Sequence, residues 1–514
     1  MGTKVVSSLL AVVALAACGG STDVPTPGNG GSAAPGAAGT SGSAGTTGSA
    51  GTSATAGTTG SAGSIAGSSG ATGTAGAAGG TSGTATAGTT GAAGAGGVEG
   101  GGGAGGCTIT ATSTLGTIPT VGIVTFTTNL TGITGAEIRF GPSSTGPTMT
   151  APVDLTQPSY QTLLLGMKGS TDYVFRIVAS SGAGTCTSQD YTITTGAVPS
   201  SVPKPTVTIM NAAAHSKGFI VTSSGIMGTG AWIYDADGAP VWWATGPSGT
   251  SRIEMSWDGT KMYMMALNVQ NSNAGRVNIV NMDGSGATMA AGMITSHHDL
   301  TAIPGGFATL LWNASGIDAP CSLVERADNG TMTTIIADMN TVYSVSNGKF
   351  HTNSIHYYPS DDTYTLGDRN PNLYVKVSRT GQLIWQLGGS NPKDASKNFS
   401  GVGTWSVNHG HHMLADGTFY LFNNGSGMNS AALGFKLNAT NMTATSTFTF
   451  MGTAANSMQL GDVQGLPNGN ILVTASNSGT ITEVTTGGQT VASLKFAEVG
   501  YAEYRDSLYG PPPR

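Results

Sequence analysis

Four short segments in the C-terminal half of the chain carry the side chains best suited to chemistry. The 514-residue sequence holds eight histidines, and seven of them lie between residues 297 and 412. Histidine acts as nucleophile, acid or base near neutral pH, and the guanidinium of arginine fits the oxygens of sulfate or phosphate. These side chains indicate a site that handles an anion and a proton. The segments are His297-His298-Asp299, His351-Thr352-Asn353-Ser354-Ile355, Leu366-Gly367-Asp368-Arg369 and Asn408-His409-Gly410-His411-His412.

Two of the segments have the spacing of β-strands in which alternate side chains lie on one face. Residues i and i+2 of a β-strand share a face. We therefore expect His351 and Asn353 to point the same way, and likewise His409 and His411, with His412 on the opposite side.

The elements that position these residues are predicted to be short strands joined by tight turns. From residue 204 to residue 514, Asp-Gly and Asn-Gly turns alternate with apolar strands, which is a strong hairpin signal. Many hairpins at similar spacing indicate an all-β sandwich, barrel or propeller. As a propeller with ~50 residues per four-stranded blade, the segment 204–514 would have about six blades. The turns include Asp237-Gly238, Asp258-Gly259, Asp283-Gly284, Asp416-Gly417 and Asn468-Gly469.

A separate small domain is predicted before the propeller, over residues 107–196. Its alternating apolar runs are typical of strands, and the run ending at Tyr173 resembles the tyrosine corner of fibronectin type III domains. We expect a β-sandwich that acts as a spacer or a dimerisation module, so that a homodimer is conceivable. Residues 197–203 form a short linker.

The first 18 residues resemble the signal peptide of an exported lipoprotein. Lys4 precedes an apolar stretch too short to span a membrane, and Leu15-Ala16-Ala17-Cys18 matches the bacterial lipobox. Cys18 would carry the lipid, and Gly19 is not the aspartate of inner-membrane retention. These features favour a periplasmic or surface protein anchored in the outer membrane only by its lipid. Residues 19–106 are mostly Gly, Ala, Ser and Thr, with hardly any large apolar residue, and predict a disordered tether.

Composition and cysteine usage narrow the function further. Charged residues make up only 9% and the net charge is −6, which argues against a nucleic-acid partner. No glycine-rich phosphate loop lies between a strand and a helix, so no nucleotide cofactor is expected. Cys107 and Cys186 could form a disulfide in an oxidising compartment, which leaves Cys321 as a buried thiol.

The order of the motifs resembles the PAPS-independent bacterial arylsulfotransferases over most of residues 205–510. The resemblance depends on the whole ordered string, because each motif alone is weak. The motifs are His298-Asp299, His351-Thr352-Asn353-Ser354-Ile355, Arg369, Gly381-Gln382-Leu383-Ile384-Trp385-Gln386-Leu387-Gly388-Gly389, Asn408-His409, Ala415-Asp416-Gly417 and Phe422-Asn423-Asn424-Gly425.

The resemblance implies a six-bladed propeller that moves a sulfuryl group from an aryl sulfate to a phenol, with no cofactor and no metal. His409 matches the nucleophile, which forms a sulfohistidine. Positions that hold the sulfate oxygens and manage the phenolic proton are matched by the following residues: His298, His351, Asn353 and Arg369. The implied partners are small aryl sulfates and phenols.

Some positions depart from the family pattern. Asn408 replaces the usual Gln, Asp368 the usual Ser and Asn423 the usual Asp. Asp368 could compete with sulfate for Arg369 if its carboxylate pointed inward, but on a strand it should point away.

Several assignments stay open at the level of the sequence. His411 is a rival nucleophile or a substrate contact, and Trp405 is a candidate wall of a phenol pocket. His297, His356 and His412 are expected to be packing residues. Two other functions compete: a catalytically silent binding propeller, and a metal site of imidazoles, which the nearby arginine would disfavour.

Overall fold

In the computed structural model, the described residues are 106–268, 271, 273–425, 430–452 and 457–512. The predicted signal peptide with Cys18 and nearly all of the predicted tether lie outside them. Over the described residues the chain is all-β, with three short 3-10 helices: η1 (Pro158–Tyr160), η2 (Met339–Thr341) and η3 (Ala395–Lys397).

Residues 107–196 form two antiparallel sheets around an apolar core. Alternate residues of β6 are buried, as expected for strands with one face on a core. Cys107 and Cys186 form a disulfide with an S–S distance of 2.13 Å, as the sequence suggested. One sheet holds β1 (Ile109–Leu115), β2 (Gly122–Thr128) and β5 (Thr162–Leu164). The other holds β4 (Met149–Pro152), β3 (Ile133–Pro142), β6 (Asp172–Ser181) and β7 (Gly184–Thr187), with β8 (Tyr191–Thr194) paired to β6.

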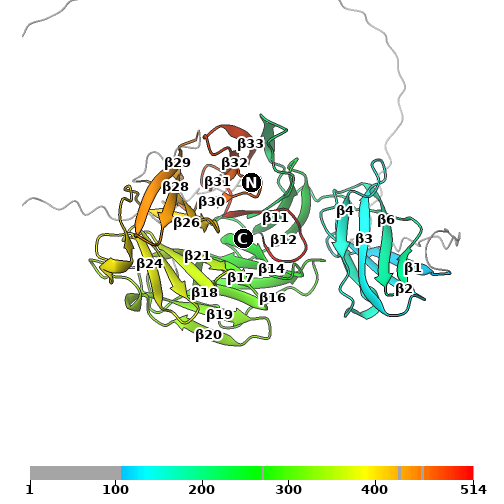
Figure 1. Ribbon diagram of the computed structural model, residues 1–514, viewed down its shortest axis with the longest axis horizontal. Helices are drawn as coiled ribbons and strands as arrows, with labels where there is room; N and C mark the ends of the chain where they lie inside the picture. Colours follow the sequence, from blue (N-terminus) through cyan, green and yellow to red (C-terminus); the bar gives the residue numbers. More distant parts are fainter. Residues whose placement is uncertain (1–105, 269–270, 272, 426–429, 453–456, 513–514) are drawn as a thin grey trace, which may run out of the picture. The chain divides into compact units, whose positions relative to one another are not determined.

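The remaining strands form six further sheets that follow one another along the chain (Figure 1). The first three are built from the following strands: β12 (Pro240–Thr245), β11 (Gly230–Asp235), β10 (Phe219–Ser223) and β34 (Ala502–Arg505); β13 (Thr250–Met255), β14 (Lys261–Ala266), β15 (Arg276–Asn281) and β16 (Thr288–Met289); β17 (Ser296–Ile303), β18 (Gly306–Trp312), β19 (Cys321–Ala327) and β20 (Met332–Ile336).

The last three sheets contain most of the segments singled out in the sequence. Their strands are, in order: β21 (Thr352–Tyr358), β22 (Thr363–Asp368), β23 (Leu373–Ser378), β24 (Leu383–Gly388) and β25 (Asn398–Phe399); β26 (Asn408–Met413), β27 (Thr418–Asn423), β28 (Ala431–Asn438) and β29 (Thr443–Phe450); β30 (Asp462–Gly465), β31 (Ile471–Ala475), β32 (Thr480–Val484), β33 (Thr490–Lys495) and β9 (Thr206–Ile209).

The predicted turns lie between the strands that they were expected to join. Each turn glycine has a positive φ, for example +76° at Gly238 and +83° at Gly417, a conformation that glycine adopts without steric cost. Strands β13, β17, β21, β26 and β30 contact one another in succession, and β30 contacts β34. The C-terminal strand β34 pairs with β10, and the early strand β9 pairs with β33. Both ends of the segment thus complete sheets at the start and the end of a closed series, an arrangement typical of a β-propeller.

Candidate functional site

The candidate site lies where the innermost strands begin. His298, His351 and His409 come from β17, the residue before β21, and β26, and Arg369 directly follows β22. Each of these inner strands has a register shift near its first residues. Such bulges redirect side chains and are frequent beside active sites. We call the four side chains His298, His351, His409 and Arg369 the histidine cluster.

His409 is held by Asn424, which follows the neighbouring strand β27. The Asn424 Nδ2 group donates hydrogen bonds to the carbonyl oxygens of Ser457 (2.6 Å) and Leu460 (2.8 Å). Its Oδ1 atom must therefore be the acceptor toward His409 Nδ1, at 2.7 Å. His409 consequently carries its proton on Nδ1 and a lone pair on Nε2.

The Nε2 atom of His409 is buried and has no hydrogen-bond partner among the described residues. Burial, and after it the charge of Arg369, lowers the pKa of His409 to about 3. The imidazole is therefore neutral at neutral pH. A neutral ring with an unengaged lone pair has the properties of a nucleophile.

His298 and His351 lie in contact within the histidine cluster. Their Nε2 atoms are 3.1 Å apart, and their rings meet edge to face. His298 has a φ of +61°, a strained conformation for a residue with a side chain. Burial lowers the pKa of His351 to about 4 and holds the pKa of His298 well below its usual range. Both imidazoles are therefore neutral at neutral pH.

Arg369 brings the permanent charge of the cluster, and its neighbour Asp368 does not compete for the anion. Arg369 is only 5% exposed and lowers the pKa of His351 and of His409. The Asp368 carboxylate accepts from the backbone N–H of His351 at 3.0 Å and from the hydroxyl of Tyr343 at 2.7 Å. It therefore points away from the site, as the strand alternation predicted, and supports His351 from behind.

Asn353 joins two inner strands close to the cluster. Its Nδ2 group donates to the backbone oxygen of Asn408 at 2.7 Å, directly before His409. Its Oδ1 atom is buried and has no hydrogen-bond partner among the described residues. Asn353 can thus position β26 and offer an acceptor to a hydroxyl group.

The structure places His411 and Trp405 differently from what the sequence suggested. His411 lies between the hydroxyls of Ser354 (3.0 Å from Nδ1) and Thr365 (2.6 Å from Nε2), so both ring nitrogens are engaged. The register shift between Asn408 and His411 breaks the i, i+2 alternation, which is why His411 does not share the face of His409.

Trp405 belongs to a hydrophobic cluster instead of a phenol pocket. Its ring packs against Tyr374 and Phe435, with centroid distances of 6.2 and 5.7 Å. The positive-φ Gly388 approaches the same ring closely, because a Cβ there would lie 2.5 Å from it. The ring of Trp405, a candidate wall of a phenol pocket in the sequence, is thus engaged in packing against neighbouring strands.

The other histidines of the motifs have mixed environments. His297 is buried, stacks on Trp312 with a centroid distance of 4.3 Å, and places Nδ1 at 2.8 Å from Nδ1 of His298. It was expected only to pack, yet it contacts a member of the cluster. His412 accepts the backbone N–H of Gly465 at 3.1 Å, in line with the packing role expected for it.

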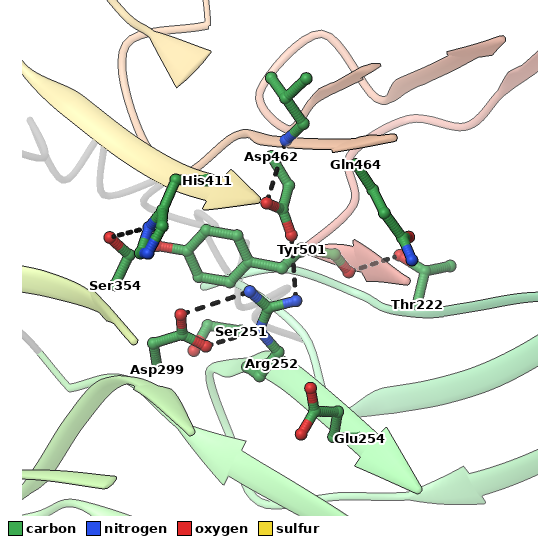
Figure 2. A network of polar contacts seen from close by, with 12 residues as sticks. Thr222, Ser251, Arg252, Glu254, Asp299, Ser354, His411, Asp462, Gln464 and Tyr501 are labelled. Carbon is green, nitrogen blue, oxygen red and sulfur yellow. Dashed lines mark hydrogen bonds and ion pairs between the residues drawn. The ribbon is translucent and has the colours of Figure 1, made fainter. Parts of the chain in front are cut away.

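An ionic network adjoins the cluster through Asp299, the residue after His298 (Figure 2). The Arg252 guanidinium contacts Asp299 at 2.6 Å and Asp462 at 3.0 Å, and it lies over the ring of Tyr501 at 4.3 Å. Asp299 also accepts the backbone N–H groups of Leu300 (2.9 Å) and Ile355 (3.0 Å). The network ties together β13, β17, β21 and β30, and so sets the relative positions of the strands that carry the cluster.

Sequence reasoning missed Asn424, Arg252 and Asp318. Asn424 lies within a family motif, but its contact with His409 depends on the pairing of β26 with β27. Arg252 has no motif around it, and Asp318 lies in the loop between β18 and β19. Cys321 was expected to be buried, and burial raises the pKa of its thiol to about 12.

The described segments contain neither a cluster of metal-binding side chains nor a helix able to span a membrane. No group of three or more His, Cys, Asp or Glu side chains there is arranged to hold a metal ion. No helix within them has the length and apolar character needed to cross a membrane.

Comparisons with known proteins agree with the motifs. The arylsulfotransferase (ASST) family matches residues 321–497, which include His351, Arg369 and His409. No curated protein matches the chain.

Similar solved structures share little sequence with this chain. They include the periplasmic gluconolactonase PpgL of Pseudomonas aeruginosa, with 12% identity over 56% of this chain and 99% of that chain, at a TM-score of 0.40. The Myceliophteria thermophila Cps50 (Swd1) β-propeller domain has 11% identity over 57% and 90% of the two chains, at a TM-score of 0.35. A streptogramin B lyase has 12% identity over 57% and 87%, at a TM-score of 0.36. Similarities this low say nothing about function.

The family match covers the second half of the closed series of sheets and three members of the histidine cluster. The similarity of this chain to the arylsulfotransferase (ASST) family thus extends over residues 321–497.

Proposed function

We propose that this protein transfers a sulfuryl group from a phenolic sulfate ester to an acceptor phenol, without PAPS, through a sulfohistidine on His409. The observation that carries the proposal is the unengaged Nε2 lone pair of His409, buried beside the guanidinium of Arg369. His411, on the same strand β26, differs from His409 because both of its ring nitrogens are engaged.

In the first half-reaction, the Nε2 lone pair forms the N–S bond while the S–O bond to the donor phenol breaks. The electron pair leaves on the phenolic oxygen, which then takes a proton. Arg369 and an N–H of His298 are suited to hold the sulfuryl oxygens as charge moves toward the leaving group. Asn424 keeps the Nδ1 proton in place, so that the attacking nitrogen never carries one.

In the second half-reaction, the acceptor phenol loses its proton and attacks the sulfur, and the N–S bond breaks to regenerate neutral His409. Covalent relay divides one difficult displacement into two steps and predicts ping-pong kinetics. Asn353 could orient the acceptor hydroxyl through its buried Oδ1.

The test is release of 4-nitrophenol from 4-nitrophenyl sulfate by the full chain, with phenol as acceptor and no nucleotide present. We expect turnover that depends on phenol, and a quenched sample without phenol should show one added sulfuryl group on a peptide containing His409. His409→Ala should show neither. Absence of turnover with a panel of aryl sulfates would refute the enzyme and favour a tethered binding propeller.

We further propose that the six sheets between β9 and β34 are the six blades of one propeller, and that residues 107–196 are a fibronectin type III-like domain. The hydrogen bond from the backbone N–H of Lys168 to the Tyr173 hydroxyl, at 2.7 Å, supports the second assignment, because it is the contact of a tyrosine corner. We also propose that Cys18 anchors the chain as an outer-membrane lipoprotein. Fatty-acid labelling that Cys18→Ser abolishes is the corresponding test.

A further inference from the structure

A chain of hydrogen bonds leads from the histidine cluster to a carboxylate at the surface. Asp318 Oδ1 lies 3.0 Å from His351 Nδ1, His351 Nε2 lies 3.1 Å from His298 Nε2, and His298 Nδ1 lies 2.8 Å from His297 Nδ1. The His351 side chain is fully buried, whereas the side chain of Asp318 is 37% exposed. The chain therefore connects buried imidazoles with solvent through one residue.

The position of each proton follows from the carboxylate end of this chain. An ionised carboxylate can only accept, so His351 carries its proton on Nδ1 and a lone pair on Nε2. His298 must then donate from Nε2 to that lone pair, which leaves its Nδ1 to accept from Nδ1–H of His297. With Asp318 ionised, each nitrogen–nitrogen contact of the chain therefore has one donor and one acceptor, and the direction of the donors is fixed from Asp318 inward.

The resulting tautomers match the tasks of the proposed reaction. Once a substrate takes the place of the hydrogen bond between the two Nε2 atoms, His351 presents a lone pair on Nε2 and can accept a proton. His298 presents an N–H on Nε2 and can donate to a sulfuryl oxygen. With His409, whose lone pair is set by Asn424, three neighbouring histidines thus receive three different roles from the residue behind each of them.

We propose that Asp318 is the proton outlet of the active site, acting through His351. The inference rests on the proposed function. When the acceptor phenol attacks, His351 Nε2 forms a bond to the phenolic proton, the Nδ1 proton passes to the Asp318 carboxylate, and Asp318 releases it to water. For the donor half-reaction, Asp318 first takes up a proton from water and His351 changes from its Nδ1–H to its Nε2–H tautomer. Protonated Asp318 then gives its proton to Nδ1 while the Nε2 proton goes to the departing phenolate oxygen.

The surroundings of Asp318 suit this role better than those of Asp368, the other carboxylate in contact with His351. The hydrogen bond from His351, together with one from Asn370 Nδ2 at 3.1 Å, keeps the pKa of Asp318 below its usual range. Asp318 is thus ionised and exposed. Asp368 is fully buried and contacts His351 through the backbone N–H and not through the ring, so that it cannot take a proton from the ring.

The first experiment compares the full chain with Asp318→Asn over a series of aryl sulfate donors. General acid help matters little when the leaving phenolate is stable and much when it is basic. We expect Asp318→Asn to react nearly normally with 4-nitrophenyl sulfate in the donor half-reaction. With phenyl sulfate it should lose about 10²-fold in rate. Asp394→Asn is the matched control, since that carboxylate is 42% exposed and bonds only Ser396 and Lys397 nearby.

Two outcomes would refute the proposed role of Asp318 in proton transfer. An equal loss with every donor would indicate a structural role for Asp318, and an unchanged rate with every donor would indicate no role. If the unmutated chain transferred no sulfuryl group from any donor, the proposed function itself would be refuted, and the outlet with it.

A second measurement keeps the inference testable if Asp318→Asn fails to fold. With only eight histidines, ¹⁵N-histidine labelling can report the protonated nitrogen of each ring. We expect His351 to carry its proton on Nδ1 and His298 on Nε2, whatever the activity. A resting His351 protonated on Nε2 would contradict the direction of the hydrogen-bond chain and sink the proposal.

Discussion

The histidine cluster and the ionic network around Arg252 lie side by side, yet they use their polar atoms in opposite ways. In the network, Arg252 contacts two carboxylates and an aromatic ring, and nearby His411 bonds through both nitrogens (Figure 2). In the cluster, His409 Nε2 has no partner within the described part of the chain.

The proposed nucleophile His409 and the neighbouring His411 differ in their bonding. Both rings are fully buried, and burial lowers the pKa of each to about 3. Neither burial nor pKa therefore separates them. What separates them is bonding: every nitrogen of His411 is committed to holding strands together, whereas one nitrogen of His409 is left for a substrate.

Removal of the reactive nitrogen should have the largest effect. We expect His409→Ala to lose at least about 10⁴-fold in the rate of sulfuryl transfer, because no covalent intermediate can form. The measurement is the initial rate with 4-nitrophenyl sulfate and phenol. His411→Ala is the matched control, and its folded fraction should keep transfer within about tenfold. An equal loss of transfer rate in both variants would contradict the proposed difference between His409 and His411.

Removal of one charge from the network should affect stability instead of chemistry. Asp299→Asn is expected to lower the free energy of unfolding by about 3–5 kcal/mol, since it leaves Arg252 with a weakened partner in a buried site. Asp462→Asn should cost less, because burial raises the pKa of Asp462 to about 7 and its charge is only partly formed. Urea unfolding checks both, and the reverse order would contradict this view of the network.

Removal of the group behind His409 should reduce the rate less than removal of His409 itself. Asn424→Ala is expected to lower kcat by about 10²-fold, because the proton can then move to the attacking nitrogen. Asn424→Asp keeps an acceptor but adds a negative charge, which should raise the pKa of His409. As the pH is lowered, the rate of Asn424→Asp should therefore begin to fall at a higher pH than the rate of the unmutated protein. A rate profile that is the same in both variants would speak against control of the tautomer.

A change of pH should have the smallest effect on the rate over the physiological range. The neutral imidazoles are the active forms, and the pKa values of His351 and His409 are about 4 and about 3. The rate should thus change less than about twofold between pH 7.5 and 5. Below pH 5 the rate should fall, because these rings then take up protons. Initial rates over a pH series check this, and a midpoint near 6.5 would show that the histidines are not buried in solution.

The same pKa shifts predict an acid-sensitive fold. Between pH 6.5 and 4, unfolded histidines bind protons that the buried ones do not, so stability falls as the pH is lowered. Asp368 and Asp462, with pKa values raised to about 6 and about 7, act in the opposite direction over part of this range. Five buried histidines with lowered pKa values outnumber them: His297, His298, His351, His409 and His411.

Much of the fold and part of the site could be predicted from local patterns. The Asp-Gly and Asn-Gly turns lie between the expected strands, and the Cys107–Cys186 disulfide is present. Asp368 points away from Arg369, as alternation along a strand requires. The assignment of His411 as a rival nucleophile or substrate contact stays a prediction, and the structure adds that both of its nitrogens are engaged. A bulge in β26 shifts the register by one residue between Asn408 and His411, and no pattern in the sequence marks that bulge.

The sequence by itself determined the strand-and-turn repeat and the order of the histidine motifs, since both depend on neighbouring residues. Only the tertiary structure decided that His409 keeps an unengaged nitrogen whereas His411 does not. That choice depends on partners from other strands and loops, such as Asn424 for His409 and Asp318 for His351. A hydrogen bond between residues far apart in the chain is set by strand register and packing, which local spacing does not encode.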